Sequence, residues 1–161
     1  TRGVLLDVAR VKGLDVLEQS YPITAADLDA AEELAGTAVR SGDVVLVRTG
    51  AMAHLPGDKW AYTLAGTGLT METAAWFHER DVAAVATDTI TFEVYPFDEG
   101  IDLAVHLLHL VEMGMTQGQN WVLDELAADC ADDGHYDFLL EASPLPFVRA
   151  VGSPVNPVAV K

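Results

Sequence analysis

Three short apolar runs, each long enough for one buried strand, are separated along this chain by segments with helical character. They are GVLLDVA at 3–9, VVLVRT at 44–49 and VAAVATD at 82–88. Runs of this length, rich in Val, Leu and Ala, are typical of strands that are buried within a sheet. The alternation of strands and helices predicts an α/β fold with a mixed or parallel sheet and flanking helices.

The segments between these runs carry helix signals at their ends. Thr24 precedes a helical segment at 25–34, with Asp27 placed to complete a capping box and Gly36 placed to end the helix. Three more helices are expected, at 70–80, from 101 to Gly114, and at 123–131, with further strands at 115–119 and 135–142. No repeat or linker interrupts this order, so residues 1–161 are expected to form a single domain.

Aromatic residues gather in two places outside the strands. Residues 51–68 contain Pro56, three glycines, Trp60 and Tyr62, which predicts a long irregular loop that could line a substrate pocket or pack between subunits. Trp60, Trp76 and Phe92 are interpreted as structural residues. Trp76 and Phe77 are neighbours on one predicted helix, so at most one of them is expected to point into the core.

The charge balance excludes several function classes. The chain has 25 acidic and 9 basic residues, a formal charge of −16, and the basic residues are scattered. Such a surface repels nucleic acid and anionic membranes. No apolar run approaches the roughly 20 residues that span a bilayer, and no signal-peptide pattern is present, so a cytoplasmic protein is expected. Cys130 is the only cysteine, which rules out an internal disulfide, and it is expected to be an unreactive residue packed on a helix.

The segment IDLAVHLLHLVEMGMTQGQNWVLDEL carries the strongest chemical signal. His106, His109 and Glu112 recur every three residues, which puts them roughly along one side of a helix. Histidine can ligate a metal or move protons near neutral pH, although a histidine on an apolar helix is also often a satisfied core residue. Asp88 and Glu93 are the two acids inside an apolar segment, and for Asp88 a turn-forming role is favoured. Glycine-rich phosphate-binding loops and the Gly-x-Ser-x-Gly nucleophile motif are absent.

Taken together, several ordered segments resemble the cyclase family of metal-dependent amide hydrolases, which contains kynurenine formamidase and isatin hydrolase. The segments are RGVLLDVA, ITAADLDAA, SGDVVLVRTG, GLTMETAAWFHERDVAAVATDT, VHLLHLVEMGMTQGQNWVLDEL, YDFLLEASPLP and GSPVNPVAV. The resemblance runs from about Arg2 to Val160, and the long loop and the GSPVNP tail are nearer to the isatin hydrolase branch.

This resemblance implies a β/β/α architecture, a divalent metal (Mn²⁺ or Zn²⁺), and hydrolysis of the C–N bond of a small cyclic amide or formamide by metal-activated water. His106 falls where the family has its active-site histidine, which makes it the expected catalytic residue. Gln119 falls where isatin hydrolase has a metal-bound glutamine, which makes it the expected metal ligand. His109 and Glu112 match no family function, so His109 becomes a packing residue. A small-molecule substrate and a homo-oligomer, namely a homodimer, are also implied.

One departure from the family pattern is serious. The principal metal motif, His-x-Gly-Thr-His-x-Asp, is absent, and His54 has no second histidine four residues on. The chain is therefore expected to be the C-terminal part of a longer protein, one half of a split protein, or a degenerate relative. Because a catalytic zinc has three protein ligands, activity is expected to require an N-terminal segment or a companion chain. A chain lacking that half should expose an apolar face. The alternative is a non-catalytic, cyclase-like binding or oligomer-forming subunit.

Overall fold

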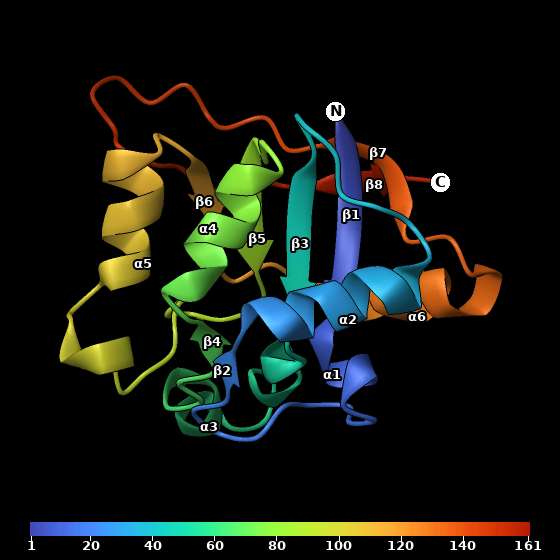
Figure 1. The fold of residues 1–161 in the computed structure, drawn as a ribbon, viewed down its shortest axis with the longest axis horizontal. Coiled ribbons are helices and arrows are strands. Elements are labelled where there is room, and N and C mark those ends of the chain that lie inside the picture. The colour runs from blue at the N-terminus through green and yellow to red at the C-terminus, as the bar shows by residue number, and fades with distance from the viewer.

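The computed structural model describes residues 1–161 and is built on a six-stranded mixed sheet in the order β6-β5-β3-β1-β7-β8 (Figure 1). The parallel strands are β1 (Arg2–Asp7), β3 (Val44–Arg48), β5 (Ala84–Thr87) and β6 (Thr116–Gly118). The antiparallel strands are β7 (Asp137–Glu141), which pairs with β1, and β8 (Val158–Val160), which pairs with β7. The α/β class and the mixed sheet predicted from the sequence are confirmed.

Helices cover both faces of this sheet. In Figure 1, α2 (Ala25–Ala35) and α4 (Glu72–Glu79) lie in front of it and α6 (Asp124–Asp133) lies behind. At the lower end are α1 (Val8–Val11), a 3₁₀ turn η1 (Ala51–His54), α3 (Lys59–Thr63), and a small parallel pair of β2 (Pro22–Ile23) and β4 (Gly68–Leu69). No helix combines the length and the apolar character that a membrane crossing requires.

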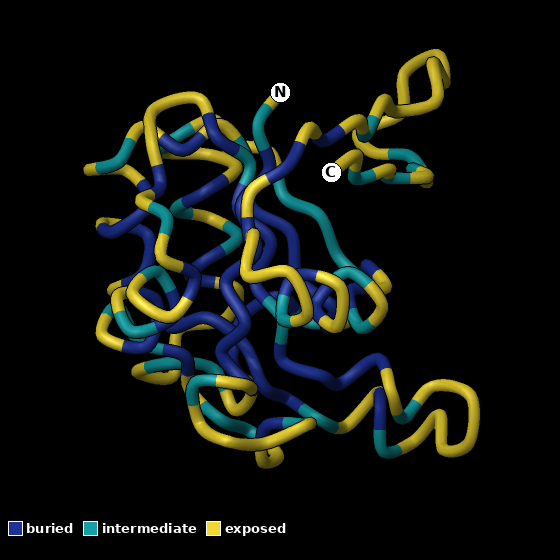
Figure 2. The backbone as a smooth tube through the Cα atoms, turned by 90° about the vertical axis from the view of Figure 1, so that its right-hand side faces the viewer, coloured by how far each residue is buried: buried dark blue, intermediate teal, exposed yellow.

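The apolar strand runs are continuous because each strand is buried on both faces. Successive side chains of a strand point to opposite faces. Val4 and Leu6 of β1 therefore join the core beneath α2 and α4, whereas Leu5 joins the core beneath α6. All three side chains are fully buried. Figure 2 shows these central strands as a buried interior and much of the segment near the C-terminus as exposed.

The predicted capping of α2 is confirmed. The Thr24 side chain accepts from the backbone N–H of Asp27, and the Asp27 carboxylate accepts from the backbone N–H of Thr24. Gly36 follows the last turn with φ of 62°, the left-handed region in which glycine lacks the steric penalty of a Cβ.

The histidine-bearing segment begins as α5 (Ala104–His106) and continues as a π-helical stretch η3 (Leu107–Glu112). A π-helix has i→i+5 bonds and a wider turn, so residues three apart do not stay on one side. The predicted single row of His106, His109 and Glu112 is therefore wrong in part. His106 is partly buried, His109 is fully buried and Glu112 is exposed.

Three expectations about aromatic and loop segments are also wrong. Residues 51–68 are not a wholly irregular loop, because η1, α3 and part of β4 lie within them. Trp76 and Phe77 are both buried. Trp76 belongs to the core cluster, while its Nε1 donates to Asp29 at 2.7 Å and the Arg80 guanidinium lies over its ring. Trp60 is 74% exposed and takes no part in the core.

The end of the chain also differs from the prediction. The strand expected at 135–142 is not the last one, since β8 forms in the proline-rich tail and pairs with β7. This strand was not predicted because prolines 154 and 157 precede it, and proline marks turns and strand boundaries. Cys130 is fully buried on α6, and burial raises the pKa of its thiol, in line with the expected unreactive packing role.

Candidate functional site

His106 lies at the junction of α5 and η3 and is held by the carboxylate of Glu93. Nδ1 of His106 hydrogen-bonds Oε1 of Glu93. The same carboxylate accepts from the backbone N–H groups of Val105 at 3.0 Å and of His106 at 3.3 Å. Glu93 is 1% exposed, so the carboxylate is satisfied by the first residues of the helix that it orients. This buried acid fixes the position of the imidazole.

Gln119 approaches His106 from the opposite side. Its Nε2 lies 2.8 Å from Nε2 of His106, although the two residues are thirteen positions apart and belong to different elements. The backbone on either side of Gln119 is hydrogen-bonded to β5 and to the turn that follows it. Gly118 pairs with Ala86, and the N–H of Asn120 donates to the carbonyl of Thr89 at 3.1 Å. The structure therefore brings together the two residues that were selected from the sequence.

The hydrogen bonds around His106 define one tautomer. A carboxylate only accepts, so Nδ1 of His106 carries the proton that points to Glu93. Nε2 then has a lone pair, which accepts from the amide NH₂ of Gln119. The Oε1 atom of Gln119 is left free for another partner. The arrangement thus presents an imidazole that can take up a proton at Nε2 once the Gln119 amide releases it, beside an amide oxygen that can bind a cation or a hydrogen-bond donor.

A second polar group lies at the ends of β3 and β5. Asp88 is fully buried and accepts from the N–H and the hydroxyl of Thr49, at 2.9 and 2.7 Å, and from the N–H of Gly50 at 2.7 Å. Burial raises the pKa of Asp88 to about 6, against the opposing effect of these hydrogen bonds. The predicted role, a turn-forming Asp that binds its own backbone, is wrong, because Asp88 binds the backbone of Thr49 and Gly50 in the turn after the neighbouring strand.

Tyr62 connects α3 to the loop that carries Gln119. Its hydroxyl donates to Oδ1 of Asn120, the residue that follows Gln119. Burial, together with the negative charge of Asp88, raises the pKa of Tyr62 to about 12, so the phenol stays protonated and remains a donor. This hydrogen bond links α3 to the residue next to Gln119.

His109 is separate from this network. Its ring is fully buried and meets the edges or faces of Phe77 and Phe92 at centroid distances of 5.6 and 5.5 Å. Neither ring nitrogen has a hydrogen-bond partner. Burial lowers the pKa of His109 to about 4, with a smaller contribution from His106. The packing role expected for His109 fits this environment.

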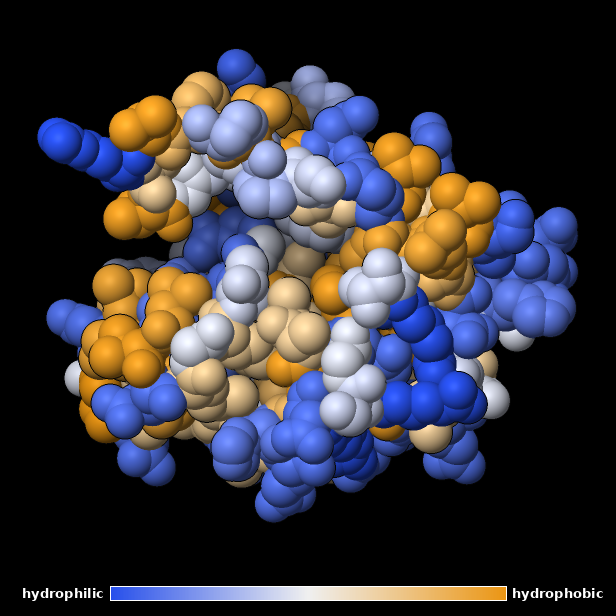
Figure 3. Space-filling view, turned by 90° about the horizontal axis from the view of Figure 1, so that it is seen from above, coloured by the Kyte–Doolittle hydropathy of each residue, from blue (hydrophilic) through white to orange (hydrophobic).

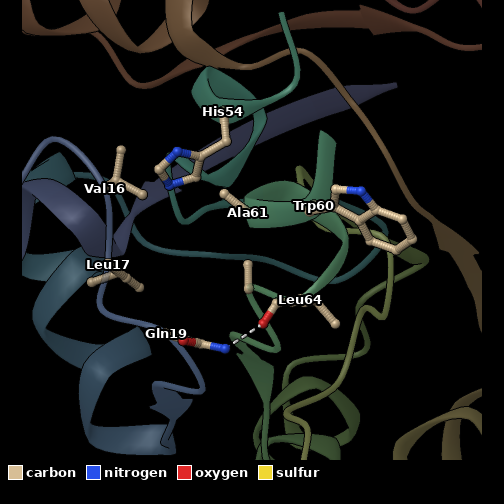
Figure 4. Close-up of a pocket in the computed structure, with 8 residues that line it drawn as sticks. Val16, Leu17, Gln19, His54, Trp60, Ala61 and Leu64 are labelled. Atoms are coloured by element: carbon tan, nitrogen blue, oxygen red, sulfur yellow. Dashed lines mark hydrogen bonds between the residues drawn. The ribbon is translucent and has the colours of Figure 1, made fainter. Parts of the chain in front are cut away.

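An apolar hollow of about 320 Å³ lies between the chain at Val16–Gln19 and the segment of η1 and α3 (Figure 4). His54 and Trp60 contribute to its rim, and Gln19 closes one side by donating to the carbonyl of Leu64 at 2.8 Å. None of its lining residues belongs to the network of His106, Glu93 and Gln119. The hollow is therefore distinct from that network.

The donor set of this chain does not complete a metal site. No cluster of three or more His, Cys, Asp or Glu side chains is arranged to hold an ion. Glu93 is already occupied by three donors and both ring nitrogens of His106 are hydrogen-bonded, which leaves the free amide oxygen of Gln119 as the available ligand. One neutral ligand falls short of the three that a catalytic zinc normally has.

Glu93, Tyr62 and Asn120 were not predicted as members of the site. Glu93 had a signal in the sequence, since it is an acid inside an apolar segment, but its distance from His106 along the chain gave no reason to pair them. Tyr62 and Asn120 had no such signal, because the fold of residues 51–65 determines where the Tyr62 hydroxyl points.

A protein family and several solved structures are similar to this chain. The profile of the Cyclase family matches residues 1–94. A crystal structure of a novel cyclase superposes with a TM-score of 0.91 and 40% identity, covering 99% of this chain and 53% of its own. An isatin hydrolase bound to the product analogue thioisatinate superposes with a TM-score of 0.74 and 17% identity, covering 98% of this chain and 58% of its own.

A further solved structure, isatin hydrolase A from Ralstonia solanacearum, superposes with a TM-score of 0.73 and 21% identity, covering 97% of this chain and 58% of its own. At such identities the two hydrolases share the fold with this chain. This chain spans little more than half the length of all three structures. Among curated proteins, no match is found.

Proposed function

This chain belongs to the cyclase family, and on that premise we propose that it carries the proton-transfer part of a hydrolase active site. The reaction is cleavage of the C–N bond of a small cyclic amide or formamide. The observation that supports this proposal most directly is the position of His106, whose two ring nitrogens meet Glu93 and Gln119. Such an imidazole has the fixed orientation that general acid–base catalysis needs.

Glu93 acts as the positioning residue in this proposal. Its buried carboxylate keeps the proton of His106 on Nδ1, so Nε2, once released by the Gln119 amide, is the atom that takes a proton from the attacking water and returns it to the leaving nitrogen. Because Glu93 also binds the backbone of Val105 and His106, it fixes the ring and the helix that carries the ring as one unit.

Gln119 is the proposed metal ligand, through its free Oε1. A divalent ion, Mn²⁺ or Zn²⁺, would polarise the amide carbonyl and lower the pKa of a bound water. An uncharged amide oxygen can serve as one ligand of either ion. Since this chain lacks a complete donor set, the remaining ligands are proposed to come from polypeptide outside residues 1–161, either a further segment or a companion chain.

The test is a hydrolysis screen of the longest native form of the protein, with any polypeptide that co-purifies, in the presence of Mn²⁺ or Zn²⁺. The substrates are formyl-amines, isatin-like lactams and hydantoins. His106→Ala should abolish turnover and leave the metal content largely intact, whereas His78→Ala, an exposed histidine on α4, should change neither. Absence of turnover on all three classes would favour the non-catalytic binding or oligomer-forming subunit, and full activity of His106→Ala would remove His106 from the reaction.

A further inference from the structure

Two residues that adjoin the partners of His106 have a left-handed backbone. Phe92, which precedes Glu93, has a φ of 64°, and Asn120, which follows Gln119, has a φ of 61°. This conformation has a steric cost for residues other than glycine, and the cost is larger for a bulky residue such as Phe92 than for Asn120. Such conformations persist only where surrounding contacts enforce them. The contacts that hold Phe92 and Asn120 therefore determine where Glu93 and Gln119 lie.

Thr89, in the turn after β5, binds both of these residues. Its hydroxyl accepts from the backbone N–H of Phe92 at 3.2 Å. Its carbonyl accepts from the backbone N–H of Asn120 at 3.1 Å. A single residue thus holds the chain beside both partners of the imidazole, through its side chain on one side and through its main chain on the other.

The hydroxyl of Thr89 is itself fixed in place. It lies 3.0 Å from the hydroxyl of Thr87, and either group can donate in this contact. Thr89 is 2% exposed, and Thr87 and Phe92 are fully buried. Since no solvent reaches these groups, a hydrogen bond that is removed here leaves a buried N–H without an acceptor.

The two sides of the imidazole differ in what holds them. On the Gln119 side, Asn120 is exposed, and it has a second anchor in the hydroxyl of Tyr62, which donates to its Oδ1. On the Glu93 side, the anchor is the hydroxyl of Thr89. Removal of that hydroxyl should therefore act first on the Glu93 side.

The turn that contains Thr89 lies away from the exposed apolar surface of the chain. The parallel strands run downward in Figure 1, so this turn follows the lower, carboxyl end of β5. The view from above in Figure 3 shows the opposite face, where apolar patches lie on both sides of a hollow on the α5 side of the molecule. A substitution of Thr89 therefore changes the interior beside His106 and leaves that face as it is.

We propose that Thr89 is a positioning residue for His106. Its hydroxyl keeps Phe92 in the conformation that directs the Glu93 carboxylate to Nδ1, and its carbonyl holds the chain that brings the amide of Gln119 to Nε2. The catalytic part of this role rests on the proposed function, because a fixed imidazole matters to turnover only if His106 transfers protons. The structural part concerns the ring alone and can be measured without any reaction.

The first measurement is the nitrogen NMR spectrum of the histidine rings, recorded without metal on the native form used for the hydrolysis screen. The signals of His106 are those that are missing from His106→Ala. The parent should show a protonated Nδ1 and an unprotonated Nε2. Thr89→Val removes the hydroxyl and keeps the shape of the side chain, so the tautomers should mix and the two shifts should move toward each other. Thr89→Ser keeps the hydroxyl and should give the parent spectrum.

Thr73→Val is the matched control for the loss of a buried hydroxyl. Thr73 is a fully buried residue of α4 whose hydroxyl donates to the carbonyl of Thr70 at 2.6 Å. This variant should lose stability but keep the His106 spectrum of the parent. A parent-like spectrum in Thr89→Val, or an equal change of shift in Thr89→Ser, would overturn the positioning role.

Turnover distinguishes this role from the proposed function. Thr89→Val should lower kcat roughly 10–100-fold with little change in KM, because no group that touches the imidazole is lost and only its orientation is loosened. Thr89→Ser and Thr73→Val should keep the kcat of the parent. A changed spectrum in Thr89→Val together with full activity of His106→Ala would end the proposed function and leave the positioning of the ring established.

Two further variants keep the proposal testable if Thr89→Val does not fold, which circular dichroism establishes. Thr89→Ala and Thr89→Ser differ in the hydroxyl alone, so their spectra should differ, and failure of Thr89→Ala to fold would overturn the role because the hydroxyl would then serve the whole fold. Asn120→Ala removes the acceptor for Tyr62 and bears the cost of the left-handed backbone, so the Nε2 shift should change while Nδ1 stays protonated. An unchanged Nε2 shift would show that the chain beside Gln119 does not position the ring.

Discussion

The carboxylate of Glu93 and the imidazole of His106 form a buried pair whose hydrogen bond joins Oε1 to Nδ1. The pair does two things at once. It selects the tautomer of His106. It also caps the start of α5, because the Glu93 carboxylate accepts from the backbone N–H groups of Val105 and His106, which have no acceptor within the helix. Catalytic geometry and local stability are therefore coupled through one side chain.

Two substitutions of Glu93 separate these effects. Glu93→Ala leaves the N–H groups of Val105 and His106 without their acceptor, which should lower the free energy of unfolding by about 1–3 kcal/mol. Glu93→Gln keeps the shape of the side chain but loosens the tautomer, and should lower kcat roughly 10–100-fold with a smaller loss of stability. Urea unfolding, turnover and NMR of the imidazole nitrogens measure the three quantities. Glu79→Gln, an exposed acid on α4, is the control, and equal turnover in Glu93→Gln and the parent would contradict the positioning role.

Gly68 allows the backbone of Glu93 to come close to β4. A Cβ built on Gly68 would lie 2.4 Å from the backbone carbon of Glu93, a distance that no packing adjustment of a side chain can relieve. Gly68→Ala should therefore displace Glu93 and lower stability by about 1–3 kcal/mol. Gly57→Ala is the matched control, because nothing lies within 4 Å of its Cβ position. If the two variants have the same urea midpoint, the close approach is not a constraint.

The sequence predicted the sheet and its helices because their signals are local and repeated. A buried parallel strand has to be apolar on both faces, and Thr24, Asp27 and Gly36 mark the ends of α2 by backbone chemistry alone. Prediction from the sequence fails where the structure depends on contacts between residues that are far apart along the chain. The indole Nε1 of Trp76 donates to Asp29 on a different helix, and β8 forms only because β7 offers an edge to pair with.

The candidate site shows the same division. His106 and Gln119 were selected by resemblance, and their 2.8 Å contact is a fact of the structure, while their roles stay predictions. The partner Glu93 is set by the chain path between β4 and α5, including the positive φ of Phe92. No periodic pattern encodes that path, so the sequence alone does not pair Glu93 with His106.

Gln119→Ala tests the proposed metal ligand. Removing Oε1 takes away one metal ligand, so metal occupancy of the complete protein should fall roughly 10-fold or more. The fold should remain, since the backbone of Asn120 still binds Thr89 and that of Trp121 still binds Thr87. Elemental analysis after equilibrium dialysis against Zn²⁺ or Mn²⁺ gives the occupancy. Gln19→Ala, outside the network of His106, is the control. Equal metal content in Gln119→Ala and the parent would rule out ligation.

The pH dependence of stability contains two opposed contributions. The pKa of His109 falls to about 4 on folding, so the folded state binds its proton less well than the unfolded chain does. The contribution of His109 to the free energy of unfolding is therefore fully present above the unfolded pKa of about 6.5 and is lost as pH falls toward 4. The pKa of Asp88 rises to about 6, so its contribution has the opposite sign, and stability is lost as pH increases from 4 to 6.

His109→Leu removes the contribution of His109 to the pH dependence of stability and leaves that of Asp88. Leucine fills a similar volume and takes away two buried nitrogens that have no partner, so stability at pH 7 should be unchanged or higher. At pH 4.5 the variant should exceed the parent by about 2–3 kcal/mol more than it does at pH 7, because the parent alone must keep an imidazole neutral. Urea unfolding followed by circular dichroism at both pH values measures this difference. His135→Leu, at an exposed histidine, should show no such difference. If the free energy of unfolding changes by the same amount between pH 7 and pH 4.5 in His109→Leu and in the parent, the fold does not hold His109 neutral.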